Sequence, residues 1–128
     1  MGTVEFIDTT DNAKPAIDTE TLLARCMGRI QIMDSLLTVF QASAEQNIAT
    51  LVRSISENDH AETARLAHKL KGTALTIAAH PLADTAERLC QLATSESTAE
   101  LQAYGPQIEE EFARILSQLQ NEDSGERS

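Results

Sequence analysis

His68 is followed by Lys71 three residues later, and Arg65 and Lys69 lie within the same seven residues. If residues 59–78 form one helix, His68 and Lys71 border each other on its surface, because residues three apart are neighbours. An imidazole that is open to a partner and has cations at its edge can bind an anion. The spacing therefore predicts a local anion site, whereas an ordinary histidine on a solvated, charged helix face is the alternative.

A helix over 59–78 would bury a stripe that lies away from His68. With a step of about 100° per residue, Leu66, Leu70, Thr73 and Ile77 fall within about 60° of one another, which is typical of a core stripe. His68 lies roughly opposite this stripe. The outer face around it would carry Ala61, Ala64, Arg65, Lys71, Gly72 and Leu75.

Two residues on this outer face are unusual for a solvated helix. Gly72 would lie in the helix interior, where glycine is about 1 kcal/mol less favourable than alanine. Close approach by another molecule is one reason to retain a glycine there. Leu75 places an apolar group on a face that should be polar. Both residues favour a surface on which a partner docks.

The run Ala67-His68-Lys69-Leu70-Lys71-Gly72 resembles the A-H-x-L-K-G signature of histidine phosphotransfer (HPt) domains. The similarity begins near Ile17-Asp18, includes Asp59, continues through Leu82, Ala86 and Leu89, and covers roughly residues 17–120. Two positions depart from the family pattern. Ala78 occupies a place that is usually glycine, and Cys90 replaces a common glutamate.

The resemblance implies a phosphoryl carrier rather than an enzyme. His68 would accept a phosphoryl group on Nε2 from a phospho-aspartate of a receiver domain and pass it to the aspartate of another receiver, and Lys71 would stabilise the phosphoryl oxygens. The implied partners are response-regulator receivers or a hybrid sensor histidine kinase, and the receiver would supply the acidic pocket and Mg²⁺. The chain itself would then need no cofactor or metal. The docking surface would comprise Ala61, Ala64, Arg65, Lys69, Gly72 and Leu75.

The other two histidines, His60 and His80, lie at expected helix starts, and neither has a lysine three residues later. We expect capping or solvent contact for both. The two cysteines, Cys26 and Cys90, lie inside helical patterns without metal-ligand spacing, so we expect reduced thiols.

The composition disfavours two classes of partner. The 128 residues include 20 acidic and 10 basic side chains, which gives a formal net charge of −10. This charge disfavours nucleic acid and anionic membranes. The sequence shows no signal peptide and no apolar stretch near 18 residues, so we expect a cytoplasmic protein with no membrane insertion. We also expect a monomer.

The size predicts one domain, and the scarcity of glycine and proline favours helices. Apolar spacing predicts helices over about 18–27 and 29–56, a third from Asp59, a fourth after His80-Pro81 and a fifth from Ser97 to about Gln120, kinked or broken at Gly105-Pro106. Residues 1–16 and 121–128 are expected to be flexible tails around a domain over 17–120. Short connections predict an all-α fold, an up-and-down antiparallel four-helix bundle with a short additional N-terminal helix.

Three other functions are compatible with a helical bundle of this kind. A histidine kinase dimerisation domain carries an acid directly after its histidine, whereas Lys69 stands here, and the chain has no room for an ATP-binding domain. A helical module that docks a receiver without phosphotransfer is the closest alternative. A structural helical domain with no specific role is the third.

Overall fold

The computed structural model describes residues 15–127, with the backbone alone for 121–127, and this part of the chain contains five helices and no strand. The helices are α2 (Thr19–Arg25), α3 (Ile30–Ser56), α4 (His60–Thr76), α5 (His80–Thr94) and α6 (Thr98–Arg127). The all-helical class predicted from the sequence is therefore confirmed for the described residues. The predicted N-terminal tail lies outside them, except for its last two residues.

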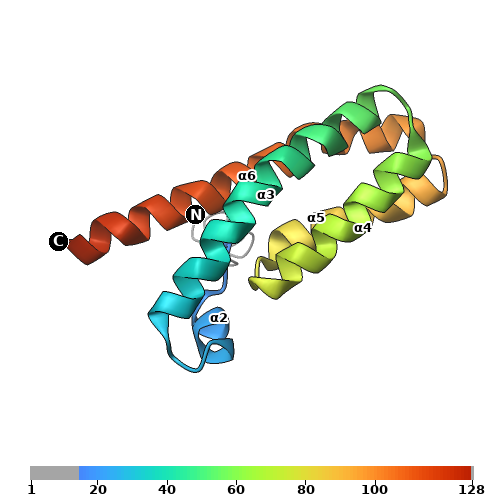
Figure 1. The fold of residues 1–128 in the computed structure, drawn as a ribbon. Coiled ribbons are helices and arrows are strands. Elements are labelled where there is room, and N and C mark those ends of the chain that lie inside the picture. Colours follow the sequence, from blue (N-terminus) through green and yellow to red (C-terminus); the bar gives the residue numbers. More distant parts are fainter. Residues whose placement is uncertain (1–14, 128) are drawn as a thin grey trace, which may run out of the picture.

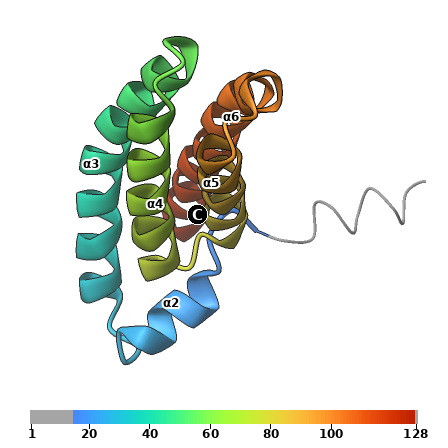
Figure 2. The same ribbon diagram turned by 90° about the vertical axis from the view of Figure 1, so that its right-hand side faces the viewer.

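Four of the helices pack in a ring. Helix α4 contacts α3 and α5, and α6 contacts the same two helices from the other side. Figure 1 shows α4 and α5 side by side. Helix α2 contacts α3 and lies across the end of the bundle at which α3 begins, as Figure 2 shows. The helix that carries His68 is therefore held from both sides.

The helix starts follow the sequence closely. Asp18 accepts a hydrogen bond from the backbone N–H of Thr21 at 3.1 Å, and Asp59 accepts one from that of Glu62 at 3.2 Å. Each aspartate satisfies a donor that the first turn of a helix leaves free. The Glu62 side chain does not return this bond, because it binds Arg65. Only half of a capping box is therefore present at α4.

The helix ends use residues in the left-handed region where glycine is usual. Asn58, Ala78 and Glu96 each have a φ of 59° just after α3, α4 and α5. Ala78 is also completely buried, and its carbonyl accepts a hydrogen bond from Asp18 at 2.9 Å. The departure at Ala78 thus places an alanine in a conformation that normally favours glycine.

The core is aliphatic and is drawn from all five helices. Its largest fully buried side chains are Ile17, Leu22, Leu51, Leu70, Ile77, Leu82, Leu89, Leu101, Ile108, Ile115 and Thr63. The hydroxyl of Thr63 is hydrogen-bonded to that of Ser54 at 2.7 Å, which satisfies both buried groups where α4 crosses α3. This packing fixes the rotation of α4 about its own axis.

Three local predictions differ from the structure. The sequence predicted a kink or a break at Gly105-Pro106; helix α6 passes through Pro106 without interruption, so the break is wrong. Gly105 precedes this proline, and its missing Cβ removes part of the clash that a proline makes with the preceding residue. The helix also continues to Arg127 rather than ending near Gln120. Ala16, which was assigned to the N-terminal tail, is buried in the core.

Candidate functional site

His68 lies on the exposed side of α4, about midway along the helix. Leu66 and Leu70 flank it in sequence and are buried, with 6% and 1% of their surface exposed. Ala67 is completely buried. These apolar neighbours hold the helix against the bundle while the ring of His68 stays on the outside. Helical spacing in the sequence places the ring on this same face.

Lys71 lies one turn beyond His68, and its ammonium group already has a partner. Its Nζ donates a hydrogen bond to Oε1 of Glu87 on α5 at 2.9 Å, and Oε2 of Glu87 accepts one from Nε2 of Gln91 at 2.8 Å. The hydrogen bond from Lys71 lowers the pKa of the Glu87 carboxyl most, Gln91 adds to this, and the charge of His68 contributes least in the same direction. An acid is therefore within electrostatic range of His68, and sequence reasoning did not find it.

The other two cations of the cluster differ from each other. Arg65 forms a two-point ion pair with Glu62, at 2.9 Å from Nε and 2.7 Å from Nη2. This hydrogen bond with Arg65 lowers the pKa of the Glu62 carboxyl. Lys69 is exposed and forms no ion pair with any described residue. Of the three cations near His68, Lys69 is thus the one whose charge no described acid neutralises by a direct contact.

Gly72 is exposed, and a Cβ at this position would meet no heavy atom within 4 Å other than the local helix backbone. Nothing inside the free protein therefore requires a glycine here. The helix would be more stable with alanine. Gly72 comes four residues after His68, so the open space lies on the same side of the helix as the ring.

A groove runs between α4 and α3 beside this cluster, with a volume of about 390 Å³. Its lining consists of Leu36, Val39, Phe40, Ser43, Lys69, Gly72, Thr73, Thr76 and Ile77. The side chains of Leu36 and Val39 are 36% and 66% exposed, and Ile32, one turn before Leu36, is 42% exposed. An apolar face of α3 therefore continues the surface that carries His68.

Sequence analysis missed this face of α3 although a signal for it was present. Ile32, Leu36 and Val39 have spacings of four and three, which form a second stripe beside the buried one. The core needs only one apolar stripe of a helix, so a second stripe indicates an apolar surface that the core does not cover. Ile30, the first residue of α3, is also 52% exposed.

The predicted docking residues are brought together only in part. Ala61 is exposed, Leu75 is 41% exposed, and Lys69 and Gly72 line the groove. Ala64 is half-buried and packs against the core, so it offers less surface than predicted. Leu75 also has a structural contact, because its carbonyl accepts a hydrogen bond of 2.8 Å from Nη1 of Arg25.

The remaining histidines and the cysteines have local contacts. Nε2 of His60 lies 3.0 Å from the hydroxyl of Thr98, which joins the starts of α4 and α6, and His80 lies in the first turn of α5. Cys26 and Cys90 are both free thiols. Within the described residues, no group of three or more His, Cys, Asp or Glu side chains is placed to hold a metal ion. No described helix is both long and apolar enough to cross a membrane.

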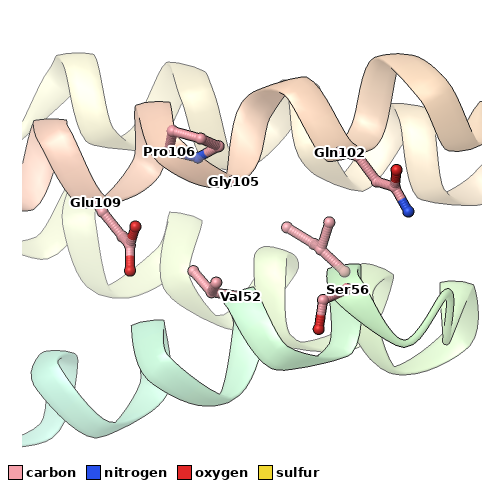
Figure 3. Close-up of a pocket in the computed structure, with 7 residues that line it drawn as sticks. Val52, Ser56, Gln102, Gly105, Pro106 and Glu109 are labelled. Atoms are coloured by element: carbon pink, nitrogen blue, oxygen red, sulfur yellow. The ribbon is translucent and has the colours of Figure 1, made fainter.

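A second hollow of about 340 Å³ lies between α3 and α6, as Figure 3 shows. It is lined by Val52, Ile55, Ser56, Gln102, Gly105, Pro106 and Glu109. Pro106 has no N–H, so the carbonyl of Gln102 lacks its usual helical donor there. Its lining includes no histidine, cysteine, lysine or arginine, and the hydroxyl of its one serine, Ser56, donates a hydrogen bond to the carbonyl of Arg53 at 2.9 Å.

Comparison with known proteins supports one family. The model of the Hpt domain family matches residues 35–122, which is more than half of the chain and includes α4, α5 and the groove between α3 and α4. The match begins after α2, later than the start near Ile17 that the sequence predicted. Comparisons with curated proteins and with solved structures give no match. On the strength of the matched segment, the chain belongs to the Hpt domain family.

Proposed function

We propose that this protein carries a phosphoryl group on His68 between the aspartates of two receiver domains. The Hpt family implies phosphotransfer in phosphorelay signalling, through contacts with receiver domains of response regulators or kinases. The observation that supports His68 as the acceptor is its exposed place on α4, beside an open glycine and an apolar groove. His60 and His80 lie at helix starts, and both are half-buried, whereas His68 is exposed.

The proposed step exchanges one bond to phosphorus for another. The lone pair of Nε2 of His68 attacks the phosphorus atom of the receiver's aspartyl phosphate. The N–P bond forms as the P–O bond breaks, and the carboxylate leaves with the electron pair. The proton on Nδ1 is then released to solvent. Transfer to the second receiver is the reverse of this exchange, with its aspartate carboxylate as the attacking group.

In this proposal, the cations near His68 are the groups of this protein that stabilise the transition state. Phosphoryl transfer leaves negative charge on the equatorial oxygens, so positioning and charge stabilisation account for most of the catalysis. Lys71 is one turn from the ring and is the proposed partner of these oxygens, once it leaves Glu87. Lys69 has no ion-pair partner among the described residues and is available to an acidic pocket on the receiver.

The groove between α3 and α4 is the proposed docking site of the receiver. Leu36 and Val39 offer apolar surface there, and Gly72 allows close approach to His68. Leu75 and Ala61 extend this proposed docking site along α4, and Arg65 lies at the edge of the site. The chain's net charge of −10 makes the local cations the part of the surface that best complements an acidic receiver site.

The finer features of the fold and of its setting belong to the same proposal. We infer an up-and-down antiparallel arrangement for the four helices that form the ring, because the turns between them are short. A monomer in the cytoplasm agrees with the proposed role, since one exposed histidine is enough for it. The protein would act as a carrier, and the receiver would supply the metal.

A transfer assay tests the proposal. The protein is mixed with a receiver domain that has been labelled with radioactive phosphate on its aspartate, and the label is followed by gel electrophoresis under alkaline conditions. The wild type is expected to take the label, and His68→Gln is expected to take none. His60→Gln is the matched control, because its ring contacts Thr98 at the far end of α4, and it should be labelled like the wild type.

The outcomes separate the proposal from the docking alternative. Label on the wild type that survives in His68→Gln would assign the acceptor to another residue. No label on the wild type, with binding to the receiver retained in a titration, would identify a docking module without phosphotransfer. Neither label nor binding against every receiver of the source organism would remove the phosphorelay role altogether.

A further inference from the structure

Glu87 and Lys71 form the only ion pair that joins α4 to α5 among the described residues. The distance from Nζ to Oε1 is 2.9 Å, and both side chains are partly exposed, 35% for Lys71 and 42% for Glu87. Gln91, one turn further along α5, holds the second carboxylate oxygen at 2.8 Å. The carboxylate is thus fixed at two points beside the phosphoryl site proposed above.

This position matters because one cation would serve two anions. In the unphosphorylated protein, the charges of Lys71 and Glu87 balance each other across 2.9 Å. A phosphoryl group on His68 brings about two negative charges to the same surface. Lys71 can then break its ion pair with Glu87 and bind the phosphoryl oxygens, or it can keep that ion pair, in which case the phosphoryl oxygens do not bind Lys71. In either case the carboxylate of Glu87 repels the phosphoryl group.

We propose that Glu87 is a positioning residue that competes with the phosphoryl group for Lys71 and thereby makes the phosphorylated form of His68 a better donor. This inference rests on the proposed function of His68. Glu87 forms no bond to phosphorus and touches no reacting atom. It acts through Lys71 and through its own charge, which lies within electrostatic range of the ring.

The direction of the effect follows from the charges. Removing the charge of Glu87 frees Lys71 for the phosphoryl oxygens and removes one repulsion, so the phosphorylated state becomes more stable. A unit charge at a partly solvated site changes an equilibrium by roughly threefold to tenfold. The N–P bond should also persist longer in water, because hydrolysis, in which water oxygen bonds to phosphorus and the ring nitrogen departs, would release less repulsion.

The test compares Glu87→Gln with the wild type. Glutamine keeps the length of the side chain and can still accept a hydrogen bond, but it has no charge. Glu111→Gln is the control for loss of an ion-paired carboxylate elsewhere, because Glu111 pairs with Arg114 on α6, which does not contact α4, although its side chain is more buried than that of Glu87, at 15% exposed. Glu87→Asp keeps the charge and tests for rescue. Melting curves of all four proteins confirm that each is folded.

Two readouts follow phosphorylation by a labelled receiver. The first is the ratio of phosphorylated His68 to phosphorylated receiver at equilibrium, and the second is the half-life of the phosphohistidine after the receiver is removed. Both should rise about threefold to tenfold in Glu87→Gln and stay near the wild-type values in Glu87→Asp and Glu111→Gln. A merely structural role for Glu87 would change the melting curve and leave the ratio unchanged.

Equal ratios and half-lives in Glu87→Gln and the wild type would overturn the inference, while label on His68 in both would leave the carrier function intact. A lower ratio in Glu87→Gln would also overturn it, because Glu87 would then support the phosphorylated state. Absence of label on the wild type would overturn the carrier function, and this inference with it.

Discussion

Gly72 gives the most discriminating perturbation of the account, because it should move stability and transfer in opposite directions. An alanine in place of this glycine removes backbone freedom from the unfolded chain and favours the helix by about 1 kcal/mol. A Cβ at Gly72 meets no heavy atom within 4 Å beyond the local helix backbone, so no clash reduces this gain. For a domain of this size, the gain corresponds to a rise in melting temperature of roughly 3–5 °C.

The same methyl group should obstruct a partner that approaches His68. Overpacking a close interface costs about 1–3 kcal/mol, so kcat/KM for phosphotransfer from a receiver to Gly72→Ala should fall about tenfold. Gly72→Leu should weaken receiver binding further, because its side chain projects over the same space. Thermal unfolding measures the first effect, and single-turnover transfer at several receiver concentrations measures the second.

Glu96→Gly is the control for a stabilised protein with an unaltered site, because it lies in the turn between α5 and α6. It should be more stable than the wild type and transfer phosphate at the wild-type rate. If Gly72→Ala gains stability and transfers normally, the open space at Gly72 is not needed for docking. If it loses stability, the structural reasoning about this position is wrong.

Four further outcomes are expected. Lys71→Ala should slow transfer about tenfold and shift the melting temperature by no more than about 2 °C, because its ion pair is partly exposed; an unchanged rate in single-turnover transfer would contradict its role. Glu96→Gly should raise the free energy of unfolding by about 0.5–1 kcal/mol in denaturant titrations, since its φ is 59°, whereas Glu96→Ala should raise it less because alanine keeps a Cβ. Val39→Asp should weaken receiver binding at least about threefold in a titration with little effect on folding, because Val39 is 66% exposed beside the groove; equal affinity would exclude this face of α3. Hydrogen bonds from the Thr21 hydroxyl and backbone hold the pKa of the Asp18 carboxyl below its ordinary value of 3.8. Asp18 should thus stabilise the fold above about pH 4 and lose this effect as the pH falls through its lower folded-state pKa, so melting between pH 5 and pH 2 should depend less on pH in Asp18→Asn, and identical profiles would exclude the cap.

The buried face of α4 could be predicted from the sequence because it depends on local periodicity. Leu66, Leu70 and Ile77 are buried where helical spacing places them, and His68 is exposed opposite them. The starts of α2 and α4 could also be predicted from the sequence, because an aspartate cap acts within one helical turn.

The contacts between helices could not be predicted in the same way. The pairing of Lys71 with Glu87 joins residues 16 positions apart, and it depends on the rotation of α5 against α4. No local pattern encodes that rotation. The ends of α4 and α5 were also hard to predict, because Ala78 and Glu96 occupy left-handed positions at which a glycine would have indicated a helix end.

The passage of α6 through Pro106 shows how packing can override a local preference. Proline removes one hydrogen bond of the helix, yet Leu101 and Ile108 are buried on either side of it. Their burial against the bundle stabilises the helix on both sides of the proline. A sequence reading based on proline alone could not weigh this tertiary contribution.

The most direct test of the central claim locates the phosphoryl group on the protein. After incubation with a phosphorylated receiver, phosphorus and nitrogen NMR of the isolated protein should show one phosphoramidate signal coupled to Nε2 of His68, and this signal should disappear in acid. A phosphoryl group on any other residue, or a spectrum with no phosphoramidate signal after complete turnover of the receiver, would contradict the account.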